Sequence, residues 1–235
     1  MITVTNIGHS GFAVECDSVM LIFDYSEGVF PTLPEKKKVC VFVSHRHPDH
    51  FNPAVFSLCA AHPDVHYYIS DDIYEYCVRD AEGVHGNYTM VHPGDDLRIT
   101  TRFRVKAFPS TDCGVAFLVF VNGRNFFHAG DLNLWLWNGM TESEAYAMTK
   151  RFEEYTSGIG SIAIDTAFLP LDTRQEIYSF LGFDYYMKHF KIRRAIPMHF
   201  FGSPKISRDL KESSVSKEYR DRIITLDPGS TTELK

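Results

Sequence analysis

Runs of apolar residues, rich in β-branched and aromatic side chains, recur along the first half of the chain with Gly or Pro between most of them. They predict strands over residues 2–7, 12–16, 19–23 and 39–43. Later runs predict strands over 66–69, 102–108, 115–121, 124–128, 161–169 and 193–197, and helices over 53–60, 71–80, 141–155, 173–190 and 207–220. Because strands dominate the first half and alternate with helices in the second, the pattern predicts an α/β fold.

The chain carries no sign of a boundary between domains. No Pro-, Gly- or Ser-rich linker, low-complexity tract or short repeat separates its parts. Its 235 residues, of which 44% are hydrophobic and 23% charged, are typical of a globular protein with a full core. We therefore expect a single domain over residues 1–235.

The net charge and the cysteine content limit which binding partners and which cellular compartment we expect for this protein. A net charge of −6 disfavours a dedicated nucleic-acid binder, because such proteins neutralise phosphates with a basic face. The five cysteines form no Cys-x-x-Cys pair and their odd number does not suit a disulfide framework, so a cytoplasmic setting fits best. The start of the chain lacks a basic segment followed by an apolar one, and no stretch approaches the roughly 18 apolar residues of a spanning helix. We expect neither export nor membrane insertion.

One apolar strand runs directly into a cluster of metal-competent side chains. The sequence His-Arg-His-Pro-Asp-His places four of them within six residues: His45, His47, Asp49 and His50. Alternate side chains of an extended backbone share a face, so His45 and His47 can converge on one ion. The intervening proline turns the chain and directs Asp49 and His50 toward a different point. The geometry suits two neighbouring cations, and chance alone would give such a motif with a probability on the order of 10⁻³.

This motif resembles that of the metallo-β-lactamase-fold hydrolase superfamily, and further markers of the superfamily follow in order. Asp24 closes an apolar run, as the early aspartate of that family does, and Asp131 follows a predicted strand where the family has its metal-bridging aspartate. His199 follows another strand, in the place of the last ligand histidine. The resemblance implies a four-layer αββα sandwich, metallo-β-lactamase-like, that binds two divalent metal ions. We expect Zn²⁺, with Mn²⁺ or Fe²⁺ as the alternatives.

Two weaker likenesses point to one branch of the superfamily. Residues 8–12, Gly-His-Ser-Gly-Phe, and residues 168–171, Phe-Leu-Pro-Leu, resemble the branch that includes L-ascorbate-6-phosphate lactonase and related metal-dependent hydrolases. A shared fold does not fix a reaction, so lactone hydrolysis enters as an analogy only.

The chain departs from the superfamily pattern at the third histidine of the first metal. The corresponding stretch, residues 108–114, reads Phe-Pro-Ser-Thr-Asp-Cys-Gly and contains no histidine. We favour Asp112 as the replacement, since a carboxylate binds zinc at about the same distance as an imidazole. Cys113, whose thiolate is a softer donor, Ser110 and a water are the alternatives. A further alternative is that the first metal site is weak or empty.

Five more residues are candidates for the surroundings of the metals. Asp24 is expected to orient ligand histidines, and His9, on a Gly-flanked turn, either lines the cleft or is a plain turn residue. Trp135 and Trp137 follow the bridging aspartate closely and are candidate walls of a substrate cleft, with core packing as the alternative. Asp172 either faces the cleft as a proton donor or caps the helix that follows it.

The reaction that these residues predict is metal-assisted hydrolysis. The expected ligands are His45, His47 and Asp112 for the first ion, Asp49, His50 and His199 for the second, and Asp131 as the bridge. Asp49 and Asp131 are also the candidate catalytic residues. A metal-bound hydroxide would attack an ester, lactone or phosphoester bond of a small-molecule substrate. The alternatives are a phosphodiesterase or nuclease on the same metals, a redox iron enzyme, and a non-catalytic member that binds a small ligand through an altered metal site. The sequence leaves the oligomeric state open.

Overall fold

The computed structural model describes residues 2–73 and 87–234. The chain forms two compact units. The first comprises Met1–His92, Cys113–Val115 and Leu226–Lys235, and the second comprises Pro93–Asp112 and Ala116–Thr225. Each unit contains one large β-sheet.

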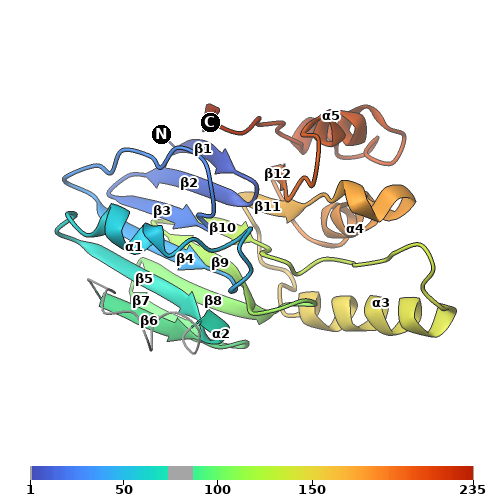
Figure 1. The fold of residues 1–235 in the computed structure, drawn as a ribbon, viewed down its shortest axis with the longest axis horizontal. Helices are drawn as coiled ribbons and strands as arrows, with labels where there is room; N and C mark the ends of the chain where they lie inside the picture. The colour runs from blue at the N-terminus through green and yellow to red at the C-terminus, as the bar shows by residue number, and fades with distance from the viewer. Residues whose placement is uncertain (1, 74–86, 235) are drawn as a thin grey trace. The chain divides into compact units, whose positions relative to one another are not determined.

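The first unit contains a seven-stranded sheet in the order β13-β1-β2-β3-β4-β5-β6 (Figure 1). Its strands are β1 (Ile2–Gly8), β2 (Gly11–Cys16), β3 (Val19–Phe23), β4 (Lys38–Val43), β5 (Val65–Ser70), β6 (Asn87–Val91) and β13 (Thr231–Leu234). Strands β3 to β6 are parallel, whereas β13, β1, β2 and β3 pair antiparallel. The carboxyl ends of β3, β4 and β5 therefore meet at one edge of the sheet, the edge at which α/β proteins usually bind ligands.

Both faces of the central strands of this sheet are buried. On one face, Val41 and Tyr67 belong to an apolar cluster with Phe56 of helix α1 (Ala54–Cys59), and the rings of Phe56 and Tyr67 lie 5.1 Å apart. On the other face, the rings of Phe42 and Tyr68 stack at 4.9 Å. A strand that is buried on both faces needs apolar residues at every position, which explains why β4 reads as a continuous apolar run.

Apart from the first residue of β9, the second unit contains the other sheet, with six strands in the order β12-β11-β10-β9-β8-β7. Its strands are β7 (Asp96–Thr100), β8 (Phe103–Pro109), β9 (Val115–Val121), β10 (Arg124–His128), β11 (Thr166–Pro170) and β12 (Ala195–Met198). Asn122 and Gly123 connect β9 to β10 with φ of +51° and +77°, as the tight turn of a two-residue hairpin requires. Strands β10, β11 and β12 are parallel, so their carboxyl ends also meet at one edge.

Two helices of the second unit pack on its sheet through aromatic rings. Helix α3 (Glu142–Ser157) begins with a capping box, in which Thr141 and Glu144 each accept a hydrogen bond from the backbone N–H of the other. Phe152 of α3 and Tyr186 of α4 (Leu181–His189) have ring centroids 5.3 Å apart, and the Tyr186 ring lies 5.7 Å from that of Phe127 on β10. These contacts attach both helices to the middle of the sheet.

The second half of the chain departs from its predicted helices at two places. The helix predicted over 173–190 is interrupted, because the short helix η2 (Thr173–Tyr178) precedes α4 and Glu176 inside it has φ of +51°. The helix predicted over 207–220 is instead α5 (Lys205–Glu212), which follows Pro204 and ends before two serines. A separate turn, η3 (Arg220–Arg222), lies further along.

Three strands were not predicted. They are β6, β7 and β13, each of which lies at an end of its sheet. Four of the five residues of β7 are exposed and its sequence is mostly polar, so no apolar run marks it. The predicted helix over 71–80 is present as α2 (Asp71–Ile73), and residues 74–80 lie outside the described part of the chain.

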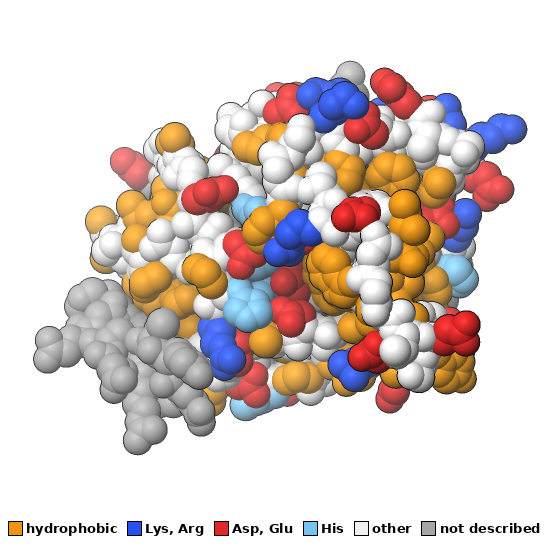
Figure 2. Space-filling model, turned by 45° about the vertical axis from the view of Figure 1, so that its right-hand side comes forward, with side chains coloured by type: hydrophobic (Ala, Val, Ile, Leu, Met, Phe, Trp, Pro, Cys, Tyr) orange, Lys and Arg blue, Asp and Glu red, His pale blue; other side chains and the backbone are white. Residues whose placement is uncertain are grey.

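No helix within residues 2–73 and 87–234 has the length and apolar composition needed to cross a membrane. On the described part of the face drawn in Figure 2, Lys and Arg side chains lie among Asp and Glu side chains. This mixture agrees with the small net charge of −6.

Candidate metal centre

Asp24 organises the histidine motif of the first unit. It follows β3, and the motif follows the parallel neighbour β4. The buried Asp24 carboxylate accepts hydrogen bonds from Ser44 N at 2.7 Å, from Ser44 Oγ at 2.6 Å and from His50 Nδ1 at 2.7 Å. Because His50 donates through Nδ1, its lone pair lies on Nε2, which is the arrangement of a metal-ligating histidine with a carboxylate partner.

His45 and His47 form a pair beside this network. His45 is buried, and its Nδ1 lies 3.0 Å from Ser44 Oγ. The ring centroids of His45 and His47 are 4.7 Å apart, and a ligand nitrogen of each lies within 4.8 Å of the other. The two histidines therefore lie close enough to share an ion, although Arg46 and His47 form a bend and not the extended backbone that was predicted.

Cys113, one of the alternatives to a third histidine, also lies at this pair. Its Sγ is 3.9 Å from His47 Nε2. The neighbouring Gly114 has φ of +63°, and a Cβ there would lie 2.0 Å from the Ser44 carbonyl oxygen. That carbonyl accepts a hydrogen bond from Val115 N at 2.9 Å. Only glycine permits this approach of the backbone, which keeps Cys113 beside the motif.

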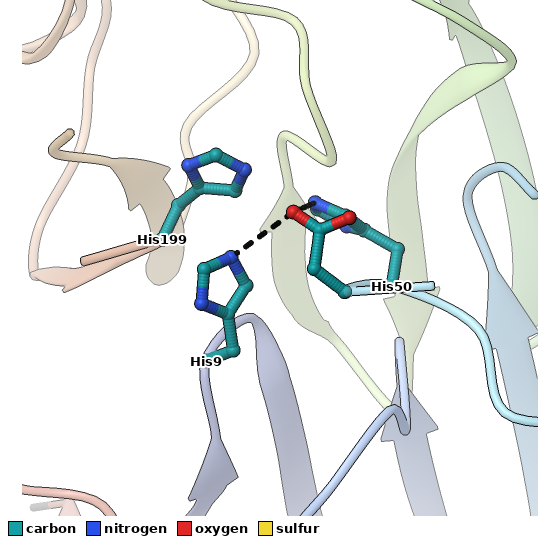
Figure 3. A group of neighbouring side chains, drawn as sticks. His9, His50 and His199 are labelled. Carbon is teal, nitrogen blue, oxygen red and sulfur yellow. Dashed lines mark ion pairs between the residues drawn. The ribbon is translucent and has the colours of Figure 1, made fainter. Parts of the chain in front are cut away.

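His9 lies on the turn between β1 and β2, and Figure 3 shows its ring directed toward a carboxylate beside His50. His9 Nε2 is 3.4 Å from Asp49 Oδ2, which in turn is 4.0 Å from His50 Nε2. The first unit therefore brings His9 together with two predicted ligands of the second ion.

The second unit gathers three candidate residues at the carboxyl edge of its parallel strands. Asp131, Asp172 and His199 follow the adjacent strands β10, β11 and β12, and all three are buried. His199 Nε2 lies 3.2 Å from Asp131 Oδ1, and His199 Nδ1 lies 3.3 Å from Asp172 Oδ2. One ring nitrogen thus faces the predicted bridging carboxylate while the other contacts a carboxylate that fixes the orientation of the ring.

Asp172 is held from its other side by Arg174. Its Oδ1 accepts a hydrogen bond from Arg174 N at 2.8 Å, which caps η2, and its Oδ2 accepts one from the Arg174 guanidinium at 2.6 Å. Burial raises the pKa of the Asp172 carboxyl, but hydrogen bonding with His199 and Arg174 outweighs burial and leaves that pKa below its ordinary value. Asp172 is therefore charged at neutral pH, which fits an orienting and capping residue better than a proton donor.

Aromatic side chains pack around His199 in the second unit. The Trp135 indole donates a hydrogen bond to the Asp131 carbonyl at 2.9 Å, and its ring lies 5.5 Å from that of His199. Trp137 stacks on Trp135 at 5.8 Å with an interplanar angle of 2°. The ring centroids of Phe201 and His199 are 5.0 Å apart. These rings fix the position of His199 relative to the loop that carries Asp131.

Asp112 belongs to the segment that supports the same loop. The Thr111 hydroxyl donates to the Asn133 carbonyl at 2.6 Å and accepts from Asn133 N at 3.0 Å. Asp112 N donates to Ser110 Oγ at 3.2 Å, and an Asp112 carboxylate oxygen lies within 4.8 Å of one from Asp131. The structure therefore brings two predicted carboxylate ligands together in the second unit.

Three of these residues have left-handed backbone conformations. The φ angles are +39° for His9, +41° for Asp24 and +63° for His199. Such conformations cost a residue other than glycine on the order of 1–3 kcal/mol, so the surrounding structure must hold these residues in place. Asp17, Asn122 and Glu176, outside the site, share this conformation.

The donor sets of both units fit a divalent metal ion. Imidazole nitrogens and carboxylate oxygens are the ligands preferred by zinc and by other first-row metals in hydrolases. In each unit, one histidine is oriented by a buried carboxylate, His50 by Asp24 and His199 by Asp172. Partners of this kind characterise metal ligands.

Sequence reasoning missed three supporting residues. Ser44 links Asp24 to His45, Thr111 holds the loop after β10, and Arg174 holds Asp172. The only sign of them in the sequence was their closeness to candidate site residues: Ser44 directly precedes the predicted ligand His45, and Arg174 follows Asp172 by two positions.

Known proteins resemble this chain over its whole length, although no protein-family model matches it. It is 25% identical over 248 residues to a UPF0173 metal-dependent hydrolase of Pelotomaculum thermopropionicum, covering 98% of this chain and 99% of the relative. The solved structure of Igni18, a metallo hydrolase of Ignicoccus hospitalis, is similar with a TM-score of 0.69 and 18% identity, covering 100% of this chain and 99% of that chain. The metallo-β-lactamase fold protein YhfI of Bacillus subtilis is similar with a TM-score of 0.62 and 16% identity, covering 99% and 100%. The predicted α/β class is confirmed, and the chain has the metallo-β-lactamase fold. Its similarity to metal-dependent hydrolases supports the resemblance to the hydrolase superfamily that shares this fold.

Proposed function

We propose that this protein is a zinc-dependent hydrolase that cleaves an ester, lactone or phosphoester bond of a small molecule. The observation that carries the proposal is the pair of carboxylate-oriented histidines, His50 on Asp24 and His199 on Asp172, each at the carboxyl edge of parallel strands. The full-length similarity to a metal-dependent hydrolase supports the reaction class.

The ligand assignment follows the superfamily pattern. We assign His45, His47 and Asp112 to the first ion, Asp49, His50 and His199 to the second, and Asp131 to the bridge. The distances within each unit support the pairs His45–His47, Asp112–Asp131 and Asp131–His199. Cys113, at 3.9 Å from His47 Nε2, is the alternative to Asp112.

When bound, the ions lower the pKa of a coordinated water from 15.7 to about 7 and stabilise the charge that develops on the electrophile. The residues of the chain supply orientation. Asp24 holds the proton of His50 on Nδ1, so that Nε2 presents its lone pair, and Asp172, 3.3 Å from His199 Nδ1, is placed to do the same for His199. Arg174 fixes the Asp172 carboxylate by hydrogen bonding and, together with His199, lowers the pKa of that carboxyl.

The charge of the surface favours a small-molecule substrate over a nucleic acid. The net charge is −6, and basic side chains lie among acidic ones on the face in Figure 2. A nuclease would need a continuous basic surface to bind the phosphate backbone.

The test combines metal content with turnover. The metal-loaded full chain should hydrolyse at least one member of a panel of lactones, phosphoesters and thioesters, and a chelator should abolish that turnover. His47→Ala should lose both metal and activity, whereas His189→Ala, a change at the exposed end of α4, should retain both. If His47→Ala keeps its full metal content and activity, the ligand assignment is wrong. A wild-type protein that binds no metal after metal-replete purification would instead favour a non-catalytic, ligand-binding role.

A further inference from the structure

His9 occupies a turn that the sheet register brings to the ligand-bearing edge. Strand β2 pairs antiparallel with β3, so Phe12 near the start of β2 lies opposite Phe23 at the end of β3. The turn before β2 therefore lies beside Asp24, which directly follows β3. Gly11 closes this turn, and a Cβ at Gly11 would come within 3.1 Å of the Asp24 carbonyl oxygen. The small residue allows the turn to pack against the segment that orients the histidine motif.

The turn aims the His9 ring at two predicted ligands. Nε2 of His9 lies 3.4 Å from Asp49 Oδ2, and the His9 and His50 rings meet edge to face with centroids 6.0 Å apart. One ligand atom from each of the three residues lies within 4.8 Å of the others. Figure 3 shows the His9 nitrogen directed toward the carboxylate from the side of the β1–β2 turn. The His9 side chain is only 10% exposed, so this orientation is fixed by packing.

We infer that His9, Asp49 and His50 form a three-ligand site for one divalent cation, with His9 Nε2 as a metal ligand. The superfamily pattern supplies Asp49 and His50 but gives His9 no such role. All three residues belong to the first unit, so this unit alone provides two imidazoles and one carboxylate. The inference rests on the proposed metal-dependent function and adds one ligand to the second metal site assigned there.

The separations agree with ligands that share one ion. At metal–ligand distances of roughly 2.0–2.2 Å, tetrahedral ligand atoms lie roughly 3.3–3.6 Å apart, and ligands on opposite sides of an ion lie roughly 4.2 Å apart. The His9–Asp49 separation of 3.4 Å falls in the first range, and the His50–Asp49 separation of 4.0 Å falls between the two. The orientation of His50 completes the set, because its Nδ1 is engaged by Asp24 at 2.7 Å and its Nε2 faces Asp49.

A simpler role for His9, a hydrogen bond to Asp49, makes different predictions. Removing an outer hydrogen-bond partner of a ligand costs roughly 10–100-fold in metal affinity and leaves the number of bound imidazoles unchanged. Removing a ligand costs more and lowers that number. Cobalt distinguishes the two roles, because each histidine bound to Co²⁺ gives an exchangeable N–H signal with a large hyperfine shift in the proton NMR spectrum.

The experiment uses the full-length wild type, His9→Asn and, as matched control, His189→Asn, which changes an exposed histidine of α4. Asparagine tolerates the left-handed backbone of position 9, and His9→Gln serves as a second variant. Circular dichroism confirms that each variant is folded. Co²⁺ stoichiometry and affinity are measured by titration, and the hyperfine-shifted N–H signals are counted.

We expect the wild type and His189→Asn to bind two Co²⁺ per chain with the same affinity. Both His9 variants should lose more than 100-fold in affinity at one site, together with a single hyperfine-shifted signal. Variants that keep every shifted signal would overturn the ligand role of His9 while leaving the proposed function intact. A wild type that binds no Co²⁺ would overturn the proposed function itself, and this inference with it.

Discussion

Replacing Asp24 with Asn tests the carboxylate that organises the histidine motif. Asparagine has the same shape and tolerates the left-handed φ of +41° at this position, so the change removes one charge and converts one acceptor into a donor. The remaining carbonyl oxygen can still accept from Ser44 N. The new amide group then faces Ser44 Oγ and His50 Nδ1, which lie 2.6 Å and 2.7 Å from the original oxygen.

The Ser44 hydroxyl can rotate to accept a hydrogen bond from this amide, but His50 must change tautomer. Its proton moves to Nε2, and the nitrogen that would bind the metal becomes a donor. Loss of a hydrogen bond to a buried charged group costs about 1.5–3 kcal/mol of unfolding free energy. In a protein of this size that loss corresponds to roughly 3–12 °C in the midpoint of thermal unfolding. Metal affinity should fall by roughly 10–100-fold.

The assay is thermal unfolding in the presence of a chelator, followed by zinc titration against a chromophoric competitor. Asp17→Asn is the matched control, since Asp17 is exposed on the β2–β3 turn and also has a positive φ, of +48°. It should leave both measurements unchanged. If Asp24→Asn unfolds at the wild-type temperature and binds zinc with wild-type affinity, Asp24 does not orient His50 as described.

Three further predictions concern other parts of the molecule. Gly182→Ala would place a Cβ 1.9 Å from Asn133 Oδ1, so urea unfolding should show a loss of about 1–3 kcal/mol, and an unchanged midpoint would contradict the packing at this contact. Burial raises the pKa of the Cys40 thiol to about 12, above the ordinary value of 9.0; the thiol ionises first in the unfolded chain, so the unfolding free energy should fall as the pH rises from about 9 to about 12. Cys40→Ala should show a smaller decline over that range, and an equally steep one would argue against this assignment. Arg174→Met removes the guanidinium that holds Asp172 and should weaken zinc binding by roughly 10–100-fold in the same competition assay, whereas undiminished binding would show that Asp172 needs no such support.

The strands that could be predicted are those with apolar residues on both faces. Those predicted over 19–23 and 115–121 have the observed bounds, because their burial demands continuous apolar runs. The strand predicted over 124–128 also has the observed bounds, although its first two residues are polar. Strands at the sheet ends, such as β7, need apolar residues at few positions and left no signal. The interruption before α4 was hidden because helical periodicity continues across it, while Glu176 adopts φ of +51°.

The candidate ligands could be predicted because a dense motif and strand ends mark them. His9 was named only as a cleft or turn residue, and its contact with Asp49 could not be predicted, since that contact depends on the pairing of β2 with β3 and not on any pattern near His9 in the sequence. The same holds for Asp172, whose contact with His199 follows from the parallel pairing of β11 with β12. Contacts set by strand register join residues that are distant along the chain. Local patterns in a single sequence therefore give little sign of such contacts.

Anomalous X-ray diffraction from crystals grown with zinc tests the proposed metal centre most directly. Two anomalous peaks per chain should lie roughly 2.0–2.2 Å from ligand nitrogen or oxygen atoms, one beside His45 and His47 and the other beside Asp49 and His50. Absence of zinc from both positions, or zinc bound only at unrelated surface residues, would contradict the proposal that this chain is a metal-dependent hydrolase.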